Sequence, residues 1–339
     1  MKGKGCIGLQ RETGTIGLKI QYIPVRDGAA VLSCEGFGSV IRLPERIDGL
    51  PVREICAYAF SAPGAAAKHL PAGAGIRSAA VGNPAAPGRE ETFLGGASLR
   101  KVALPQGVQA IGEYAFYNCA SLSRIRLCAG SARIGNGAFM NCGALREIAF
   151  SASPDEPTCL PGLLTEIQQE VRVAFRSGNE TAVWIFPEYF EESVENAPAH
   201  IFEHFIHGAG YRYRQCFQGY RLDAGNYDQQ FPMAKVEAEP KTALRIALER
   251  LRHPFDLSDT AEKQYLTHLK ENAAAAASLL IEADDPEGLV FLAAHGVLTR
   301  ESIGAAVEEA VRRGRAECLS VLLNEQHVRF APKEKTFEL

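Results

Sequence analysis

Apolar side chains recur every 23 residues between about residue 93 and residue 150. The stretch from residue 111 reads IGEYAFYNCASLSRIRL, and the stretch from residue 134 reads IGNGAFMNCGALREIAF in the same frame. A half-repeat, FLGGASLRKVALP, places Phe93 in frame with Phe116 and Phe139. Because so short a unit cannot bury its apolar face alone, the period predicts a solenoid in which successive copies stack and form a long surface.

The apolar positions within each copy predict a short strand. They are two residues apart, as on the inward face of a strand: Val102 and Leu104, Ile125 and Leu127, Ile148 and Phe150. Gly112, Asn118, Gly135 and Asn141 lie between these positions and favour the turns of a coil. We therefore expect a parallel ladder of short strands along one side of the solenoid.

The repeats resemble the BspA-like family of leucine-rich repeats, whose pattern is roughly LxxIxLPxxxxxIGxxAFxxCxxL. One copy matches at Leu99, Val102, Leu104, Pro105, Ile111, Gly112, Ala115, Phe116, Cys119 and Leu122. Residues 40–60 look like the first repeat of that family, with a P-x-x-I-D-G-x-P-V segment. The resemblance implies a solenoid of the right-handed β/α type, in which Cys119 and Cys142 are small buried residues rather than reactive thiols.

The repeat pattern is interrupted near its beginning. Phe60 and Phe93 are 33 residues apart, ten more than one repeat, and the excess is rich in Gly, Ala and Pro. Such a composition predicts a protruding loop. Residues 18–37, which precede the repeats, predict a capping strand or hairpin with its turn at residues 26–28.

No repeat is visible between residues 153 and 239, where we expect a small α+β connector. The segments VRVAF and AVWIF predict two strands around a turn at residues 177–179, after a short helix near residues 163–171. A cap signal at residues 196–198 and glycines at 208 and 210 predict a further helix between them.

A second period, near 30 residues, marks the C-terminal part. Ala276 and Ala306 have this spacing, as do Leu292 and Leu322. Residues 306–326 resemble the helix-turn-helix of an ankyrin repeat, although the usual T-P-L-H opening is absent. Helices with one apolar stripe must pack on each other, so we expect three antiparallel pairs in an α-helical repeat domain.

Helix ends in this C-terminal part are marked by their own signals. Asp285 with Pro286 predicts a helix start and Gly296 its end, while Gly314 separates the last two helices. Asp259 with Glu262 predicts a capping box.

The net charge and the cysteine content of the chain narrow the classes of binding partner and the cellular compartment that we expect. A net charge of -4 gives no global attraction to nucleic acid or anionic membranes. Nine cysteines without a CxxC pair argue against a disulfide framework or a cysteine zinc site. Because neither a secretory leader nor a run of about 18 apolar residues is present, we expect a cytoplasmic protein without a membrane partner. A leader that had been removed would leave the same pattern.

Positive charge collects on the repeats. Residues 93–150 hold six basic and two acidic residues, so the rest of the chain carries a net charge of -8. Five basic residues lie on or beside the predicted strands: Arg100, Lys101, Arg124, Arg126 and Arg146. They form either a basic strip that binds an acidic protein or anionic polymer, or an ordinary solvated face.

Two short motifs carry alternative chemistry. His200, Glu203 and His204 fit the HxxEH pattern of inverted zinc peptidases, in which both histidines on one helix face bind zinc and the glutamate acts as base. The third ligand cannot be identified, and a polar helix face explains the same residues. YRYRQCF, from residue 211, interleaves aromatic and basic residues, which suits either nucleic-acid binding or an amphipathic strand.

The sequence therefore predicts an α+β multidomain protein. Its expected parts are capping strands (1–38), BspA-like leucine-rich repeats (39–152), an α+β connector (153–239) and ankyrin-like α-helical repeats (240–330). We expect a non-catalytic binding or scaffold protein that recognises a macromolecule, above all a protein, through its repeat surfaces and needs no cofactor. A zinc-dependent hydrolase and a nucleic-acid binder that uses the arginine strip are the alternatives.

Overall fold

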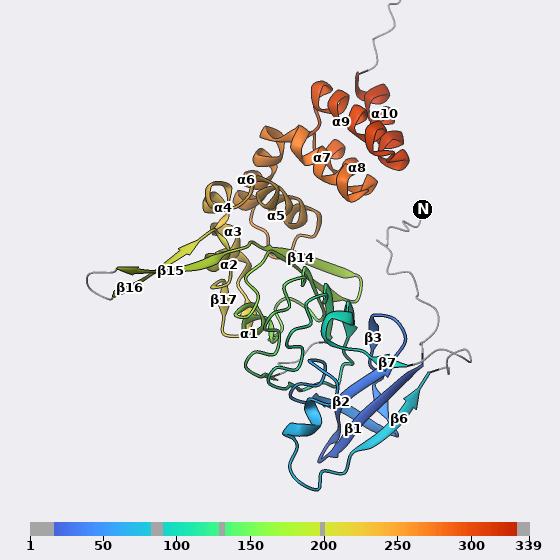
Figure 1. Cartoon of the computed structure of the whole chain (residues 1–339). Helices are drawn as coiled ribbons and strands as arrows, with labels where there is room; N and C mark the ends of the chain where they lie inside the picture. The colour runs from blue at the N-terminus through green and yellow to red at the C-terminus, as the bar shows by residue number, and fades with distance from the viewer. Residues whose placement is uncertain (1–16, 83–90, 129–132, 197–200, 331–339) are drawn as a thin grey trace, which may run out of the picture. The chain divides into compact units, whose positions relative to one another are not determined.

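The computed structural model describes residues 17–82, 91–128, 133–196 and 201–330. The chain forms two compact units, and Figure 1 labels many of their helices and strands. The repeat unit comprises Met1–Glu180 and Phe217–Leu222, and the helical unit comprises Thr181–Cys216 and Asp223–Leu339.

The N-terminal strands of the repeat unit belong to a sheet with the order β11-β9-β5-β2-β1-β6, in which β4 also pairs with β5 and β7 with β2. Its strands are β1 (Leu18–Val25), β2 (Gly28–Gly36), β4 (Arg46–Ile47), β5 (Leu50–Ile55), β6 (Arg77–Val81), β7 (Thr92–Phe93), β9 (Ala110–Ile111) and β11 (Arg133–Ile134). β1 and β2 are antiparallel and Val25 pairs with Gly28, so the predicted N-terminal hairpin is confirmed.

The second sheet of the repeat unit is the predicted ladder. Its order is β3-β8-β10-β12-β13, and it continues to β14. The strands are β3 (Val40–Arg42), β8 (Lys101–Ala103), β10 (Arg124–Cys128), β12 (Glu147–Ser151), β13 (Val171–Ser177) and β14 (Glu180–Phe186). From β3 to β13 all neighbours are parallel, and Ile125 pairs with both Val102 and Ile148. The parallel ladder is therefore confirmed.

A stack of phenylalanine rings forms the core behind the ladder. The ring centroids of Phe60 and Phe116 are 5.0 Å apart, and those of Phe116 and Phe139 are 5.1 Å apart. Phe93 does not belong to this stack, because it lies on β7 and pairs with Glu35 of β2. Placing Phe93 in the repeat frame was therefore wrong.

The excursion between Phe60 and β8 is not one protruding loop. It contains a 3-10 helix (Ala66–His69), β6, β7 and a second 3-10 helix (Gly96–Ser98), while residues 83–90 lie outside the described part. Because β6 pairs with β1 and β7 with β2, the inserted residues extend the N-terminal sheet. The following coil then stacks directly on the coil of Phe60.

Backbone packing explains the glycines and asparagines of the repeat. A Cβ atom on Gly135 would lie 2.4 Å from the backbone nitrogen of Glu113, so only glycine fits where successive coils touch. Asn118 and Asn141 have φ angles of 60° and 62°, a left-handed conformation that asparagine tolerates. The Asn141 side-chain amide donates a hydrogen bond to Oδ1 of Asn118 (2.8 Å), which links the two turns.

Cys119 and Cys142 are buried, as the repeat pattern predicts. Their thiols donate to the carbonyl oxygens of Phe60 (3.3 Å) and Phe116 (3.2 Å) on the preceding coils. Burial raises the pKa of both thiols to about 12, so neither forms a thiolate near neutral pH. Their role in the repeat is structural.

The short helix α1 (Leu160–Leu164) is confirmed, although it ends before residue 171, where β13 begins. The strands β13 and β14 are neighbours and follow each other around Gly178, whose φ of 59° suits a tight turn. The hairpin expected for VRVAF and AVWIF is thus present. A small antiparallel pair, β17 (Phe217–Gln218) and β18 (Arg221–Leu222), completes the repeat unit.

The helical unit ends in six helices that pack in pairs. Its helices are α2 (Gly210–Tyr213), α3 (Ala224–Gln229), α4 (Phe231–Glu237), α5 (Pro240–Arg252), α6 (Asp259–Glu271), α7 (Ala273–Ala283), α8 (Pro286–Ala294), α9 (Arg300–Arg313) and α10 (Ala316–Phe330). α5 contacts α6, α7 contacts α8, and α9 contacts α10. α7 also contacts α9, and α8 contacts α10, so helices 30 residues apart are neighbours, as the second period predicts. The likeness to ankyrin repeats stays a prediction.

The helix signals of the C-terminal part are mostly confirmed. The Asp285 carboxylate accepts from the backbone of Gly288 (2.8 Å) at the start of α8, and Gly296 and Gly314 have positive φ angles after α8 and α9. The capping box predicted at Asp259 was wrong by one residue, because Ser258 is the N-cap of α6.

The helix predicted to start at residue 196 was wrong. β15 (Phe190–Asn196) and β16 (Ile201–His207) form an antiparallel two-stranded sheet instead. The sequence IFEHFIH is rich in aromatic and β-branched residues, and its register with β15 outweighs the local cap signal. The segment from residue 211 is not a strand either, since Gly210–Tyr213 forms the short helix α2.

A buried ion pair joins α3 to α5 in the helical unit. The Arg250 guanidinium donates to both carboxylate oxygens of Asp228 (2.8 and 2.7 Å), and the Tyr265 hydroxyl donates to the same carboxylate (2.7 Å). Arg250 is fully buried and Asp228 is 5% exposed. Trp184, the single tryptophan of the chain, lies 5.3 Å from the guanidinium, measured to its ring centroid. The tryptophan is therefore part of the core.

Candidate functional site

The outward face of the ladder carries two rows of side chains. One residue of each strand lies in the inward apolar column and is buried: Ile41, Val102, Ile125, Ile148 and Val173. The residues before them form the first outward row: Val40, Lys101, Arg124, Glu147 and Arg172. The residues after them form the second outward row: Arg42, Ala103, Arg126 and Ala149, whereas the next residue in this register, Ala174 on β13, is buried. Within a row, neighbouring residues are about 4.8 Å apart, which is the spacing of paired strands.

Glu147 compensates part of the positive charge in the first row. Its carboxylate accepts from Nε of Arg124 (2.8 Å) and lies 4.0 Å from the guanidinium of Arg172. The side chains of Arg124 and Glu147 are 36% and 26% exposed, so their pairing contributes little to stability. Lys101, next to Arg124 in the row, is exposed and extends the positive charge beyond the ion pair.

The second row contains two arginines with a small residue between them. Arg42 and Arg126 pair with opposite sides of Ala103, so their backbones are roughly 10 Å apart, or two strand spacings. Both arginines line a hollow of about 390 Å³ together with Ala103, Glu45, Gln106 and Ser151. The Glu45 carboxylate accepts from the backbone nitrogen of Gln106 (3.2 Å). The hollow therefore combines two cations, one tethered carboxylate and several polar groups.

Arg100 and Arg146 lie one position before the strands. Both are exposed and occupy equivalent places in copies two repeats apart, with Ser123 between them. The Arg146 guanidinium donates to the carbonyl oxygens of Gly143 (2.8 Å) and Leu145 (3.1 Å), which holds its side chain against its own loop. Three of the five predicted basic residues, Lys101, Arg124 and Arg126, thus lie on the outward face of the ladder. The other two, Arg100 and Arg146, lie one position before the strands β8 and β12.

Sequence reasoning missed two cations of this face, Arg42 and Arg172. Both lie on strands, β3 and β13, outside the range in which the 23-residue period is visible. A signal for Arg42 was present, because Ile41 occupies the same apolar column as Val102 and Ile125. Aligning VIR with IRL by that column would have placed Arg42 in line with Arg126.

The structure does not provide the helix that the HxxEH interpretation needs. Glu203 and His204 are consecutive residues of strand β16, so their side chains point to opposite faces. His204 Nδ1 is 2.9 Å from the Ser193 hydroxyl on β15. His200 lies outside the described residues. Within the described part of the chain, no group of three or more His, Cys, Asp or Glu side chains is arranged to hold a metal ion.

The aromatic and basic residues from residue 211 do not share one face. Tyr213 and Arg214 are buried, and the guanidinium of Arg214 donates to the carbonyl oxygens of Pro187 and Gly210 (2.5 and 3.0 Å). Burial lowers the pKa of Arg214 to about 10. Tyr211 and Arg212 are the only aromatic and basic residues of this segment that are exposed, so the stack of alternating rings and cations that base binding needs is not formed.

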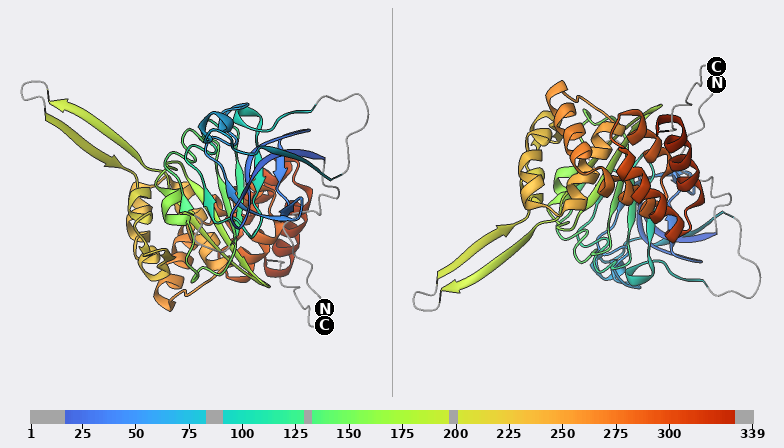
Figure 2. Two further views of the ribbon diagram at one scale, coloured as in Figure 1. Left: turned by 90° about the horizontal axis from the view of Figure 1, so that it is seen from below. Right: turned by 90° about the horizontal axis from the view of Figure 1, so that it is seen from above.

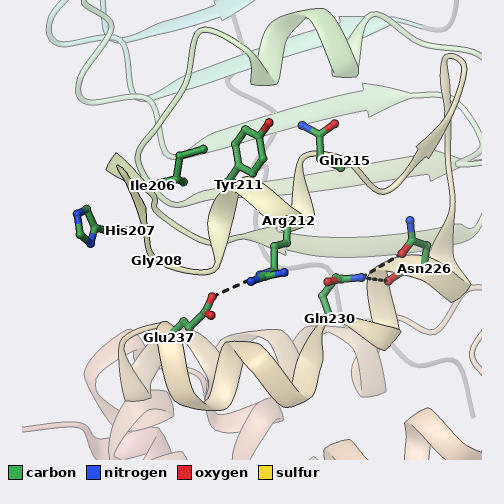
Figure 3. Close-up of a pocket in the computed structure, with 9 residues that line it drawn as sticks. All are labelled: Ile206, His207, Gly208, Tyr211, Arg212, Gln215, Asn226, Gln230 and Glu237. Carbon is green, nitrogen blue, oxygen red and sulfur yellow. Dashed lines mark hydrogen bonds and ion pairs between the residues drawn. The ribbon is translucent and has the colours of Figure 1, made fainter. Parts of the chain in front are cut away.

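A second hollow, of about 660 Å³, lies at the base of the β15–β16 hairpin (Figure 3). Arg212 on α2 pairs with Glu237 on α4 across it (3.6 Å). The Gln230 side-chain amide donates to the backbone and side-chain oxygens of Asn226 (3.2 and 3.0 Å). Because its charges and amides are already paired with one another, this hollow offers less for a charged ligand than the ladder face does.

None of the helices that the structure describes is long and apolar enough to cross a membrane.

Comparison with known proteins bears on the repeats alone. Residues 89–156 match the family model described as BspA type Leucine rich repeat region (6 copies). No curated protein matches the chain.

Among solved structures, the chain matches a leucine-rich repeat protein of T. pallidum with 24% identity and a TM-score of 0.24. This match covers 41% of the present chain and 60% of the other, less than two thirds of that protein's length. The family match and the 23-residue coils on the ladder agree, and residues 89–156 form a BspA-type leucine-rich repeat region.

Proposed function

We propose that this protein is a non-catalytic binding or scaffold protein whose ladder face recognises an acidic segment of a protein partner. The observation that carries the proposal is the second outward row, where Arg42 and Arg126 flank the small side chain of Ala103 over a hollow. A leucine-rich repeat region suggests a protein-interaction surface, and the charge on the ladder defines the chemistry of its partner.

The two arginines suit carboxylates. A guanidinium binds a carboxylate through two parallel hydrogen bonds, and Ala103 leaves room for a ligand between the two guanidinium groups. Two carboxylates of one extended peptide would therefore meet two separate cations on the same row. Lys101 and Arg172 on the first row add long-range attraction, which speeds encounter with an acidic partner.

The lining of this hollow favours a protein ligand over a nucleic acid. Leu43, Pro44, Leu104 and Pro105 supply apolar contact, while none of its described lining residues is aromatic. Single-stranded nucleic acids are usually held by aromatic rings on which bases stack. The four expected domain segments and the cytoplasmic location stay predictions.

The proposal is tested with labelled poly-L-glutamate and the full-length protein. Binding is followed by fluorescence anisotropy at low salt and then over a sodium chloride series. Arg42→Glu with Arg126→Glu should weaken binding at least tenfold, which corresponds to about 1.4 kcal/mol. The matched control, Arg133→Glu with Arg300→Glu, makes the same change in net charge at exposed arginines that belong to no strand of the ladder, and should keep most of the affinity.

Equal weakening by both double variants would show that net charge alone governs binding and would contradict a ladder-face site. An oligothymidylate that binds more tightly than poly-L-glutamate, and that loses affinity in the ladder variant alone, would favour the nucleic-acid alternative instead. Cross-linking and mass spectrometry of wild type and ladder variant in the source cell would then identify the physiological partner.

A further inference from the structure

The β15–β16 hairpin of the helical unit is a sheet of only two strands. Figure 2 shows it extending away from the helices of its own unit. Neither strand pairs with a third one anywhere in the described part of the chain. Phe190, Val194 and Phe205 lie on one face of the hairpin and are 53%, 43% and 44% exposed. An isolated two-stranded hairpin is only marginally stable in water, and additional strands stabilise it.

The two edges of this hairpin differ in charge. β15 carries Glu191, Glu192 and Glu195 and no basic residue, which blocks the approach of another strand at that edge. β16 carries one carboxylate, Glu203, between residues with high strand propensity. The edge of β16 is therefore the one that accepts another strand.

We infer that the edge of β16 pairs antiparallel with β16 of a second copy of this chain, with Phe205 on the two-fold axis. The two hairpins then form one four-stranded sheet in the order β15-β16-β16-β15. The acidic strands become the outer edges of this sheet, where they limit further growth. The assembly is a closed dimer with an isologous interface.

The sequence of β16 selects this register. With Phe205 on the axis, the two Phe205 rings are directly opposed and each Glu203 lies opposite His207 of the second copy. His207 Nε2 is also 3.1 Å from the Glu192 carboxylate on β15 of its own hairpin, so the imidazole would lie between two carboxylates. A register centred on Glu203 would oppose two carboxylates, and a register centred on His204 would place Glu203 opposite Phe205. Only the register centred on Phe205 pairs a carboxylate with an imidazole on both sides of the axis, so it is the self-complementary one.

The oligomeric state of the full-length protein tests the inference. Sedimentation equilibrium between about 1 and 100 µM should show a monomer–dimer equilibrium. Phe205→Glu would place two carboxylates on the axis and should weaken dimerisation at least tenfold. The control Val290→Glu places a carboxylate at an exposed apolar position of α8, outside the hairpin, and should leave the dissociation constant within about threefold.

Disulfide formation locates the contact independently of affinity. Phe205→Cys brings two thiols face to face on the axis, at a separation that a disulfide can bridge, whereas Val194→Cys lies on the same hairpin face but on β15. Under mild oxidant, the first variant should form a covalent dimer and the second should remain largely monomeric. Wild-type protein serves as the blank for the native cysteines.

A monomer at every concentration, together with no covalent dimer of Phe205→Cys, would overturn the inference. So would equal cross-linking of both cysteine variants, because the contact would then not be at the β16 edge. Arg42→Glu with Arg126→Glu should leave the dimer unchanged, so dimerisation and the proposed ladder-face binding can fail separately.

Discussion

The repeat unit and the helical unit are stabilised in different ways. In the repeat unit, the same contact recurs from coil to coil, as in the ring stack of Phe60, Phe116 and Phe139. In the helical unit, a buried ion pair between Asp228 on α3 and Arg250 on α5 joins two different helices through a single contact. Stability in a repeat array is approximately a sum of local terms, whereas a buried ion pair concentrates a large penalty on two residues. Substitutions should therefore have local effects in the first unit and unit-wide effects in the second.

The largest expected effect concerns the buried ion pair of the helical unit. Asp228→Ala leaves the fully buried Arg250 guanidinium without its counter-ion and removes the acceptor of the Tyr265 hydroxyl. We expect the free energy of unfolding of the helical unit to fall by about 3–5 kcal/mol. Trp184 fluorescence during urea unfolding measures it, because this single tryptophan lies beside Arg250.

Two control variants show whether the loss of stability in Asp228→Ala comes from the broken ion pair. Glu308→Ala removes an exposed carboxylate from α9 and should change the free energy by no more than about 0.5 kcal/mol. Asp228→Leu with Arg250→Met replaces both charges by apolar side chains and should recover most of the loss. If Asp228→Ala cost no more than Glu308→Ala, the ion pair would not hold the unit together.

An intermediate effect tests the local character of the repeat unit. Gly135→Ala would place a Cβ atom 2.4 Å from the backbone nitrogen of Glu113 on the neighbouring coil. The coils must separate, at a cost of about 1–3 kcal/mol. Hydrogen exchange measured by mass spectrometry should show faster exchange in β9 and β11, with the helical unit unchanged.

The matched control for Gly135 is Gly143→Ala, because no atom lies within 4 Å of a Cβ at that position. We expect a change within about 0.5 kcal/mol there. Faster exchange throughout the repeat unit in Gly135→Ala would contradict the picture of local contributions.

The smallest effect concerns the asparagine turns. Asn118→Ala forces a residue with a Cβ into the left-handed conformation and removes the acceptor of the Asn141 amide, at a cost of about 1 kcal/mol. Asn118→Gly keeps the conformation accessible and loses only the exposed hydrogen bond, so its cost should be about half as large or less. Chemical denaturation followed by circular dichroism compares the two variants. Equal losses would mean that the hydrogen bond, and not the backbone angle, requires asparagine.

Sequence reasoning was most successful where local pattern and tertiary packing coincide. The columns of Val102, Ile125 and Ile148 predicted the register of the ladder, because in a stack of equal coils each residue meets its own counterpart. The same logic failed at Phe93, where an inserted excursion joins another sheet and Phe60 becomes the neighbour of Phe116. A fixed period shows that copies are similar but does not show which copies touch.

The part of the candidate site that depends on strand alternation could be predicted from the sequence, whereas the part that depends on which strands pair could not. Arg124 and Arg126 could be placed on the outward face from strand alternation alone. Arg42 is brought beside these arginines only in the folded chain, because β3 ends at Arg42 and its ladder neighbour β8 begins 59 residues later, at Lys101. The pairing of Glu147 with Arg124 likewise needed the register of neighbouring strands.

The sequence alone determined the repeated coil, the inward columns and the helix ends at Asp285, Gly296 and Gly314, because each depends on residues close together in the chain. The tertiary structure decided what distant residues do to each other. It made a strand of the segment ending at His207, where pairing with β15 outweighed a helix cap signal. It also enclosed the charges of Asp228 and Arg250 and brought Arg42 to Arg126, since burial and strand pairing arise only when the whole chain folds.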